Sequence, residues 1–220
     1  MTLVFCLVGC EGKREALPAA AGEGRRSDAV TSSRPVPTPV AAPHAEKREA
    51  NEPKAPRAFC TEPHRPAGVR LPATRLVQLQ AGSRPLPRAR PTPPPRHWTW
   101  VNLWAAWCGP CKEEIPRLER WERALAATAS PVALAFVSLD DDEREAQRFL
   151  DTQPPTGLHR SFWLGERERA AWLGTFGLRE APTLPVQLLF DPAGELACIV
   201  GGAVEDRDFD AVRKFVGASR

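Results

Sequence analysis

The chain has 220 residues, 26% of them charged, and a formal net charge of +3. This mild charge, with arginines scattered along the chain, gives no basis for nucleic-acid binding. The prolines are distributed unevenly, because 16 of the 24 precede His97. The part after His97, about 125 residues, is the size of one domain that can bury a hydrophobic core.

The amino terminus is apolar and contains Cys6 and Cys10. The stretch Leu7–Cys10 resembles a bacterial lipobox, which predicts a signal segment over residues 1–9 and a lipid-modified Cys10. A full signal sequence also has a charged beginning and an apolar region of ~7–15 residues. No Lys or Arg precedes Cys10. A translation start further upstream would explain this difference, and a chance apolar start is the alternative. We favour the lipoprotein because a surface spacer follows.

Residues 10–58 are predicted to be this spacer, a disordered tether between membrane and domain. The segment consists mostly of Ala, Pro, Glu, Lys and Arg and has hardly any large apolar residue. Such a composition cannot bury enough surface to offset chain entropy, and repeated prolines keep the chain extended. A docking function for the Pro-rich stretch 34–43 is less favoured than the spacer.

The folded domain is expected over 59–220, with its core at 96–217. Its first part carries Leu76, Val77 and Leu79 among polar residues, a loose version of an edge-strand pattern. Turn residues and a proline cluster at 91–95 follow.

The strongest chemical signal is the pair Cys108 and Cys111, which stands between a predicted strand at 98–104 and a helical pattern from 113 onward. Pro110 suits a first helical turn, so Cys108 falls at or beside the N-cap and Cys111 one turn inside. A helix N-terminus favours thiolate over thiol, and N–H···S hydrogen bonds strengthen this effect.

The sequence Trp-Cys-Gly-Pro-Cys after an apolar strand resembles the active site of thioredoxin. Glu114 and Pro116 extend it to the Trp-Cys-x-Pro-Cys-x-x-Glu-x-Pro pattern of the TlpA/ResA-like group of membrane-anchored, extracytoplasmic thioredoxins. Asn102 stands where thioredoxin has a buried Asp, and this difference also favours the narrower group. The resemblance implies an α/β, thioredoxin-like fold with a central mixed sheet flanked by helices. It also implies thiol–disulfide oxidoreductase activity.

The resemblance also implies a role for each residue of the motif. Cys108 would attack a substrate disulfide, and Cys111 would resolve the mixed disulfide. Glu114 would raise the thiol pKa and relay a proton, and an exposed helix glutamate is the alternative. The expected substrate-binding residues are Trp107, Gly109, Pro110, Leu184 and Pro185.

The chain then continues with alternating strand and helix signals. An apolar run at 131–139 predicts a strand buried on both faces, followed by a helix to about 152. A short strand at 161–164 and a helix at 166–176 come next. The acidic run Asp140–Glu143 is interpreted as a helix start with solvated carboxylates in preference to a metal site.

The last part of the chain is predicted to form a strand from Leu184, a tight turn and a hairpin partner at 196–200. A closing helix is predicted at 205–216. In thioredoxin-like proteins a cis-proline begins this strand and faces the cysteines, and the spacing assigns that role to Pro185. A trans proline that opens a strand is the alternative. With a cis bond, the backbone of Leu184 could pair with an extended substrate.

The two remaining cysteines leave two readings open. Cys60 and Cys198 could form a structural disulfide, which an oxidising compartment permits. Alternatively, Cys198 is a small buried residue and Cys60 an exposed thiol.

A metal site is not expected, because no histidine stands at ligand spacing from the paired cysteines. The rival to an enzyme is a lipoprotein that binds copper(I) or thiols without turnover, since soft thiolates suit copper(I). A peroxidase is a third possibility, but no cysteine of this sequence stands in a peroxidase-like setting.

The enzyme would need no cofactor beyond its redox-active disulfide. We expect a monomer in the bacterial periplasm or cell envelope, held by a lipid anchor. Its partners would be protein thiols and disulfides and a membrane electron donor, with a reducing role that includes cytochrome c maturation as one setting.

Overall fold

A computed structural model of the chain describes residues 59–60 and 68–218. The expected signal segment, the tether and the lipidation residue Cys10 lie outside the described residues. Within the described part, no helix is both long enough and apolar enough to cross a membrane.

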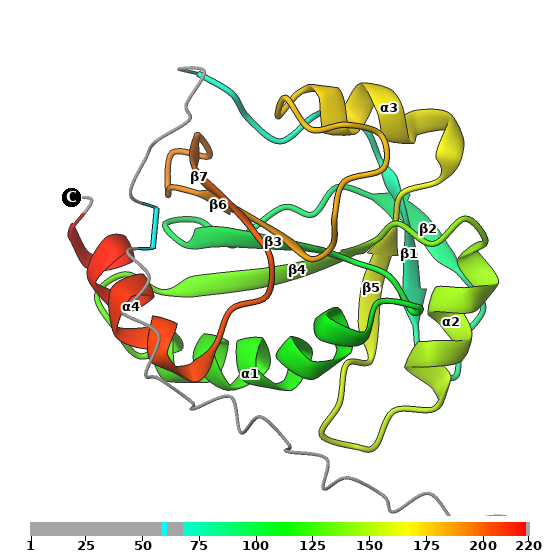
Figure 1. Cartoon of the computed structure of the whole chain (residues 1–220), viewed down its shortest axis with the longest axis horizontal. Helices are drawn as coiled ribbons and strands as arrows, with labels where there is room; N and C mark the ends of the chain where they lie inside the picture. The colour runs from blue at the N-terminus through cyan, green and yellow to red at the C-terminus, as the bar shows by residue number, and fades with distance from the viewer. Residues whose placement is uncertain (1–58, 61–67, 219–220) are drawn as a thin grey trace, which may run out of the picture. The chain divides into compact units, whose positions relative to one another are not determined.

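The described residues form seven strands, four α-helices and one short 3-10 helix, and Figure 1 shows their arrangement. In chain order they are β1 (Leu76–Gln80), β2 (Leu86–Ala89), β3 (Trp98–Trp104), α1 (Gly109–Ala126), β4 (Val132–Ser138), α2 (Glu143–Asp151), β5 (Arg160–Trp163), α3 (Glu166–Gly174), β6 (Val186–Phe190), β7 (Leu196–Gly201), η1 (Asp206–Asp208) and α4 (Phe209–Ala218).

The strands form one mixed sheet in the order β2-β1-β5-β4-β3-β6-β7. Strands β3, β4 and β5 run parallel, and the other pairs are antiparallel. The expected thioredoxin-like α/β architecture is therefore confirmed. The edge-strand prediction for β1 is wrong, because β1 pairs with both β2 and β5. The alternation of polar residues in β1 reflects half-burial, and β2 forms this edge of the sheet.

Two hydrophobic cores cover the two faces of the sheet. Strand β3 serves both, since alternate residues of a strand point to opposite faces. Trp98, Trp100 and Trp104 pack with residues of α1, α2 and α4, whereas Val101 and Leu103 pack with residues of α3. Figure 1 shows α3 on the opposite side of the sheet from α1 and α4. Every residue of β3 is buried, so the strand that leads to the cysteines is held on both faces.

Candidate active site

The cysteine pair lies where β3 leads into α1. Cys108 is the N-cap of α1, and Pro110 occupies the first helical turn, where it removes no helix hydrogen bond. The backbone N–H of Cys111 donates to Sγ of Cys108 at 3.2 Å. The two cysteines are joined by a disulfide, so the structure represents the oxidised form.

The two cysteines and their neighbours differ in their exposure to solvent. Cys111 is completely buried and Cys108 is 4% exposed, so Cys108 is the sulfur nearer to solvent. Gly109 and Pro110 are exposed, and the Trp107 side chain is 65% exposed. Trp107 is one of the residues expected to bind substrate, and its exposure suits an apolar docking face beside the cysteines.

The strand expected to face the cysteines begins at a cis peptide bond between Leu184 and Pro185. The carbonyl of Pro185 accepts a hydrogen bond from the N–H of Gly202 at 2.8 Å. This contact ties the start of β6 to the segment that follows β7.

Glu114 is fully buried, which rules out the exposed helix glutamate considered as the alternative. Its carboxylate accepts hydrogen bonds from Asn102 Nδ2 at 2.7 Å, Gln187 Nε2 at 3.0 Å and the N–H of Val204 at 2.8 Å. Burial raises the pKa of Glu114, and the hydrogen bonds from Val204, Gln187 and Asn102 act in the opposite direction. A buried carboxyl with a raised pKa, one turn beyond Cys111, is suited to proton transfer.

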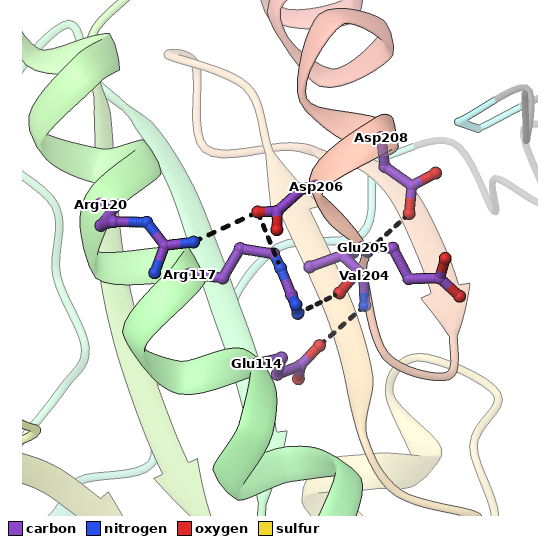
Figure 2. Close-up of polar contacts among 7 residues, drawn as sticks. All are labelled: Glu114, Arg117, Arg120, Val204, Glu205, Asp206 and Asp208. Carbon is purple, nitrogen blue, oxygen red and sulfur yellow. Dashed lines mark hydrogen bonds and ion pairs between the residues drawn. The ribbon is translucent and has the colours of Figure 1, made fainter.

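The segment between β7 and η1 is held against α1 by a small polar cluster. Figure 2 shows the side chains of Glu114 and Arg117 reaching from α1 to the backbone of Val204. Arg117 donates to the Val204 carbonyl at 2.8 Å and to Asp206 at 3.1 Å, and Arg120 donates to Asp206 at 3.2 Å. Side chains of α1 therefore bind both the N–H and the carbonyl of Val204.

A second buried carboxylate, Asp140, contacts the backbone just before the cysteines. It accepts from the N–H of Ala106 at 2.9 Å and from the Ser138 hydroxyl at 2.7 Å. The expectation that Asp140 is a solvated part of a helix start is wrong, because the residue is fully buried. The helix begins later, with Asp142 as its N-cap. Burial raises the pKa of Asp140.

The remaining cysteines of the described region, Cys60 and Cys198, form a disulfide. It attaches the segment before the domain to β7, and the neighbouring Phe59 ring packs against Trp100 and Phe215. Of the two arrangements left open by the sequence, the structure has the bonded one.

No cluster of three or more His, Cys, Asp or Glu side chains in the described residues could hold a metal ion. Copper(I) can be bound by two thiolates, so this observation does not by itself address the copper alternative. Pro116 lies inside α1, and we assign it no chemistry.

Known proteins that are similar to this chain in sequence or in fold are thioredoxin-like or thiol–disulfide exchange proteins. No family model matches the chain. A 52-residue stretch, 24% of this chain, is 36% identical to thioredoxin-like protein YneN of Bacillus subtilis (strain 168) and spans only 31% of that relative's length.

Among solved structures, the thioredoxin domain of a thiol-disulfide oxidoreductase from Bacteroides vulgatus matches with a TM-score of 0.50 and 20% identity, over 68% of this chain and 96% of that one. A thioredoxin-family thiol:disulfide interchange protein from Chlorobium tepidum TLS matches with a TM-score of 0.50 and 19% identity, over 67% and 97%. The chain has a thioredoxin-like fold. At these identities the structural matches establish this fold alone.

The sequence analysis missed three residues that surround Glu114 or the cysteine turn in this thioredoxin-like fold. They are Trp100, Gln187 and Asp140. Gln187 had a usable signal, because it is a lone polar residue in an apolar strand, and such a residue needs a buried partner. Asp140 follows directly on a buried strand, but the adjacent acidic residues concealed its different environment.

Proposed function

We propose that this protein is a thiol–disulfide oxidoreductase that reduces disulfide bonds of extracytoplasmic proteins. The observation that carries the proposal is the Cys108–Cys111 disulfide at the N-terminus of α1, with Cys108 as the N-cap. This position stabilises a thiolate on Cys108 in the reduced protein, because helix N-terminal N–H groups and the helix dipole favour negative charge.

The reaction consists of two exchanges. The Cys108 thiolate attacks one sulfur of a substrate disulfide, forms a mixed disulfide and releases the other substrate sulfur as a thiolate, which takes up a proton. Cys111 then loses its proton and attacks Cys108, which releases the second substrate thiol. The substrate gains two electrons and two protons, and the enzyme is left with the Cys108–Cys111 disulfide. A dithiol electron donor must return the enzyme to the reduced state.

Three features of the site support this sequence of steps. Cys108 is the sulfur nearer to solvent, so it is the one a protein substrate can reach. Exposed Trp107 and the backbone of Leu184 beside the cis bond offer an apolar contact and a strand-pairing partner for the substrate. Glu114 is buried one turn after Cys111, which supports its proposed role as acceptor of the Cys111 proton.

An insulin-reduction assay with dithiothreitol as the electron source tests the proposal. Cys108→Ser should abolish turnover above the uncatalysed rate, because the attacking sulfur is lost. Cys111→Ser should instead accumulate a mixed disulfide through Cys108, detectable by mass spectrometry. Wild-type turnover equal to that of Cys108→Ser would refute the enzyme and favour a thiol or copper(I) carrier.

We further propose that the protein belongs to the TlpA/ResA-like group and is anchored to the cell envelope by a lipid on Cys10. The Leu7–Cys10 pattern and the proline-rich composition of 10–58 support the anchor. The Cys60–Cys198 disulfide supports an oxidising compartment. Detergent-phase partitioning of the expressed chain should depend on Cys10, and a Cys10→Ala variant that partitions like the wild type would exclude the anchor.

The direction of electron flow depends on the reduction potential of the cysteine pair and on its electron donor. We propose reduction, in agreement with the Gly-Pro dipeptide between the cysteines, and cytochrome c maturation as one setting. Equilibration of the pair with glutathione measures the potential. A value as oxidising as that of a strong disulfide donor would reverse the proposed direction.

A further inference from the structure

The partners of Glu114 are themselves arranged by a third side chain. Asn102 on β3 and Gln187 on β6 stand directly opposite each other in the sheet, and both amides contact the Glu114 carboxylate. Trp100, two residues before Asn102 and on the same face of β3, donates from Nε1 to Gln187 Oε1 at 2.9 Å. These side chains are all buried.

The indole N–H is one of two neighbouring groups that favour one orientation of the Gln187 amide, and the other is the Gly202 carbonyl, which accepts from Gln187 Nε2 at 3.4 Å. Trp can only donate, so the Gln187 atom that faces Trp100 must be the oxygen. The amide nitrogen is then left on the side of Glu114, where it lies 3.0 Å from Oε1 and 3.2 Å from Oε2. Reversal of the amide would place two N–H donors against each other in the buried interior, which is costly.

The same constraint passes from Gln187 to Asn102. Gln187 Oε1 also accepts from Asn102 Nδ2 at 2.9 Å, so the Asn102 atom that faces it must be the nitrogen. That nitrogen also donates to Glu114 at 2.7 Å. Within the described part of the chain, Asn102 Oδ1 has no hydrogen-bond partner. Asn102 is thus oriented as a donor towards Glu114 although its own acceptor stays unpaired.

We propose that Trp100 is a positioning residue that fixes the Gln187 and Asn102 amides as donors to Glu114 and thereby holds Glu114 as a carboxylate. A protonated Glu114 needs an acceptor for its O–H, and the amides could supply one only by reversal. Trp100 opposes that reversal. This inference rests on the proposed function for its significance, because a carboxylate can accept the Cys111 proton and a protonated acid cannot.

The charged and titratable groups around Glu114 leave this role to the neutral side chains. The charged group on α1 that acts on Glu114 is Arg117, which pairs beyond Val204 with the Asp206 carboxylate. Cys108 and Cys111 are joined in a disulfide and do not titrate in the oxidised protein. Strands β3 and β6 contribute only amides and the indole to the carboxylate's surroundings. The sheet therefore affects the protonation of Glu114 through the orientation of the two amides and the indole.

The test replaces Trp100 in the full chain by β-(3-benzothienyl)alanine, which substitutes sulfur for the indole N–H and keeps the bicyclic shape. The Glu114 side-chain carboxyl is titrated by carbon NMR in the oxidised protein. Proton binding to Glu114 should tighten by roughly tenfold, because one of the contacts that orient the Gln187 amide is lost and its hydrogen bond to the charged carboxylate is weakened. Trp100→Phe should move the titration in the same direction.

Trp98 is the matched control. It lies on the same face of β3, is equally buried, and its Nε1 has no hydrogen-bond partner in the described residues. The same replacement at Trp98 should leave the Glu114 titration unchanged. An unchanged titration after replacement of Trp100, or equal shifts at both positions, would overturn the proposal.

A measurement on the unsubstituted protein keeps the test independent of folding of the variants. The Nε1–H resonance of Trp100 should shift with the Glu114 titration, and that of Trp98 should not. A Trp100 resonance that does not follow Glu114 would contradict the coupling. None of these readouts uses turnover, so a failed insulin assay would refute the proposed function without deciding this inference.

Discussion

The buried carboxylates of Asp140 and Glu114 are held in different ways. Asp140 is bound by near neighbours in space, the N–H of Ala106 and the hydroxyl of Ser138 two residues earlier in the chain. Glu114 is bound by Asn102, Gln187 and the N–H of Val204, which come from three separate elements.

The difference indicates separate tasks for the two groups. Asp140 binds the backbone two residues before Cys108, and its own carbonyl accepts from Trp163 on β5 and Arg169 on α3. It therefore fixes the position of the cysteine turn relative to the sheet. Glu114 binds mostly side-chain donors, and the orientation of these donors affects the protonation of its carboxyl group. We interpret Asp140 as a structural carboxylate and Glu114 as a functional one.

Asp140→Ala should cause the largest loss of stability. It leaves the Ala106 N–H and the Ser138 hydroxyl buried without this acceptor, at a cost of about 3 kcal/mol. Urea unfolding of the oxidised protein measures the loss. Asp210→Ala is the control, since that side chain is 72% exposed and its partner Arg213 is 58% exposed, and it should change stability little. Equal effects of the two substitutions would remove the structural role of Asp140.

Glu114→Gln should instead act mainly on the chemistry. The second exchange step should slow by about 10²-fold, because the group that accepts the Cys111 proton is lost. The Cys108 thiol should also become more acidic, because a nearby negative charge is removed. Stopped-flow kinetics and alkylation against pH measure the two effects. Glu113→Gln, on the exposed side of the same helix, should change neither, and an unmoved Cys108 titration in Glu114→Gln would refute the role of Glu114.

The pH dependence of stability tests both carboxylates together. Burial raises the pKa of Glu114 above its ordinary value of 4.5 and that of Asp140 above 3.8. The folded chain therefore binds more protons than the unfolded chain between the ordinary and the raised values. The stabilising contribution is complete below the ordinary values and is lost as pH rises through the raised ones.

Glu114→Gln and Asp140→Asn should each weaken this loss of stability with rising pH. The free energy of unfolding of each variant is compared with that of the wild type from about pH 4 to about pH 8. A difference that stays constant over this range would show that the replaced carboxyl does not titrate with folding.

The smallest effects are expected at the arginines that surround Val204. Arg117→Gln removes a hydrogen bond to the Val204 carbonyl from a side chain that is only 21% exposed, and should cost about 1 kcal/mol. Arg120 is 55% exposed and, among the residues that the structure describes, is bound to Asp206 alone, so its replacement by Gln should cost a few tenths of that amount. Thermal unfolding distinguishes them, and a larger loss at Arg120 would mean that Asp206 is the main attachment point of this segment.

Much of the architecture could be predicted from short stretches of sequence. The apolar run of β4, the helical spacing after Cys111 and the turn before β7 each depend on neighbouring residues, and each corresponds to an element of the structure. The position of β1 inside the sheet could not be predicted, because strand order depends on pairing between distant segments.

By itself, the sequence determined the cysteine spacing, the helix start at Cys108 and the proline that opens β6, since these features are local. Only the tertiary structure decided which groups surround the two carboxylates. Gln187 and Val204 reach Glu114 across 73 and 90 residues of chain. No periodicity records such contacts, because burial and hydrogen-bond pairing of a carboxylate follow from how separate elements pack.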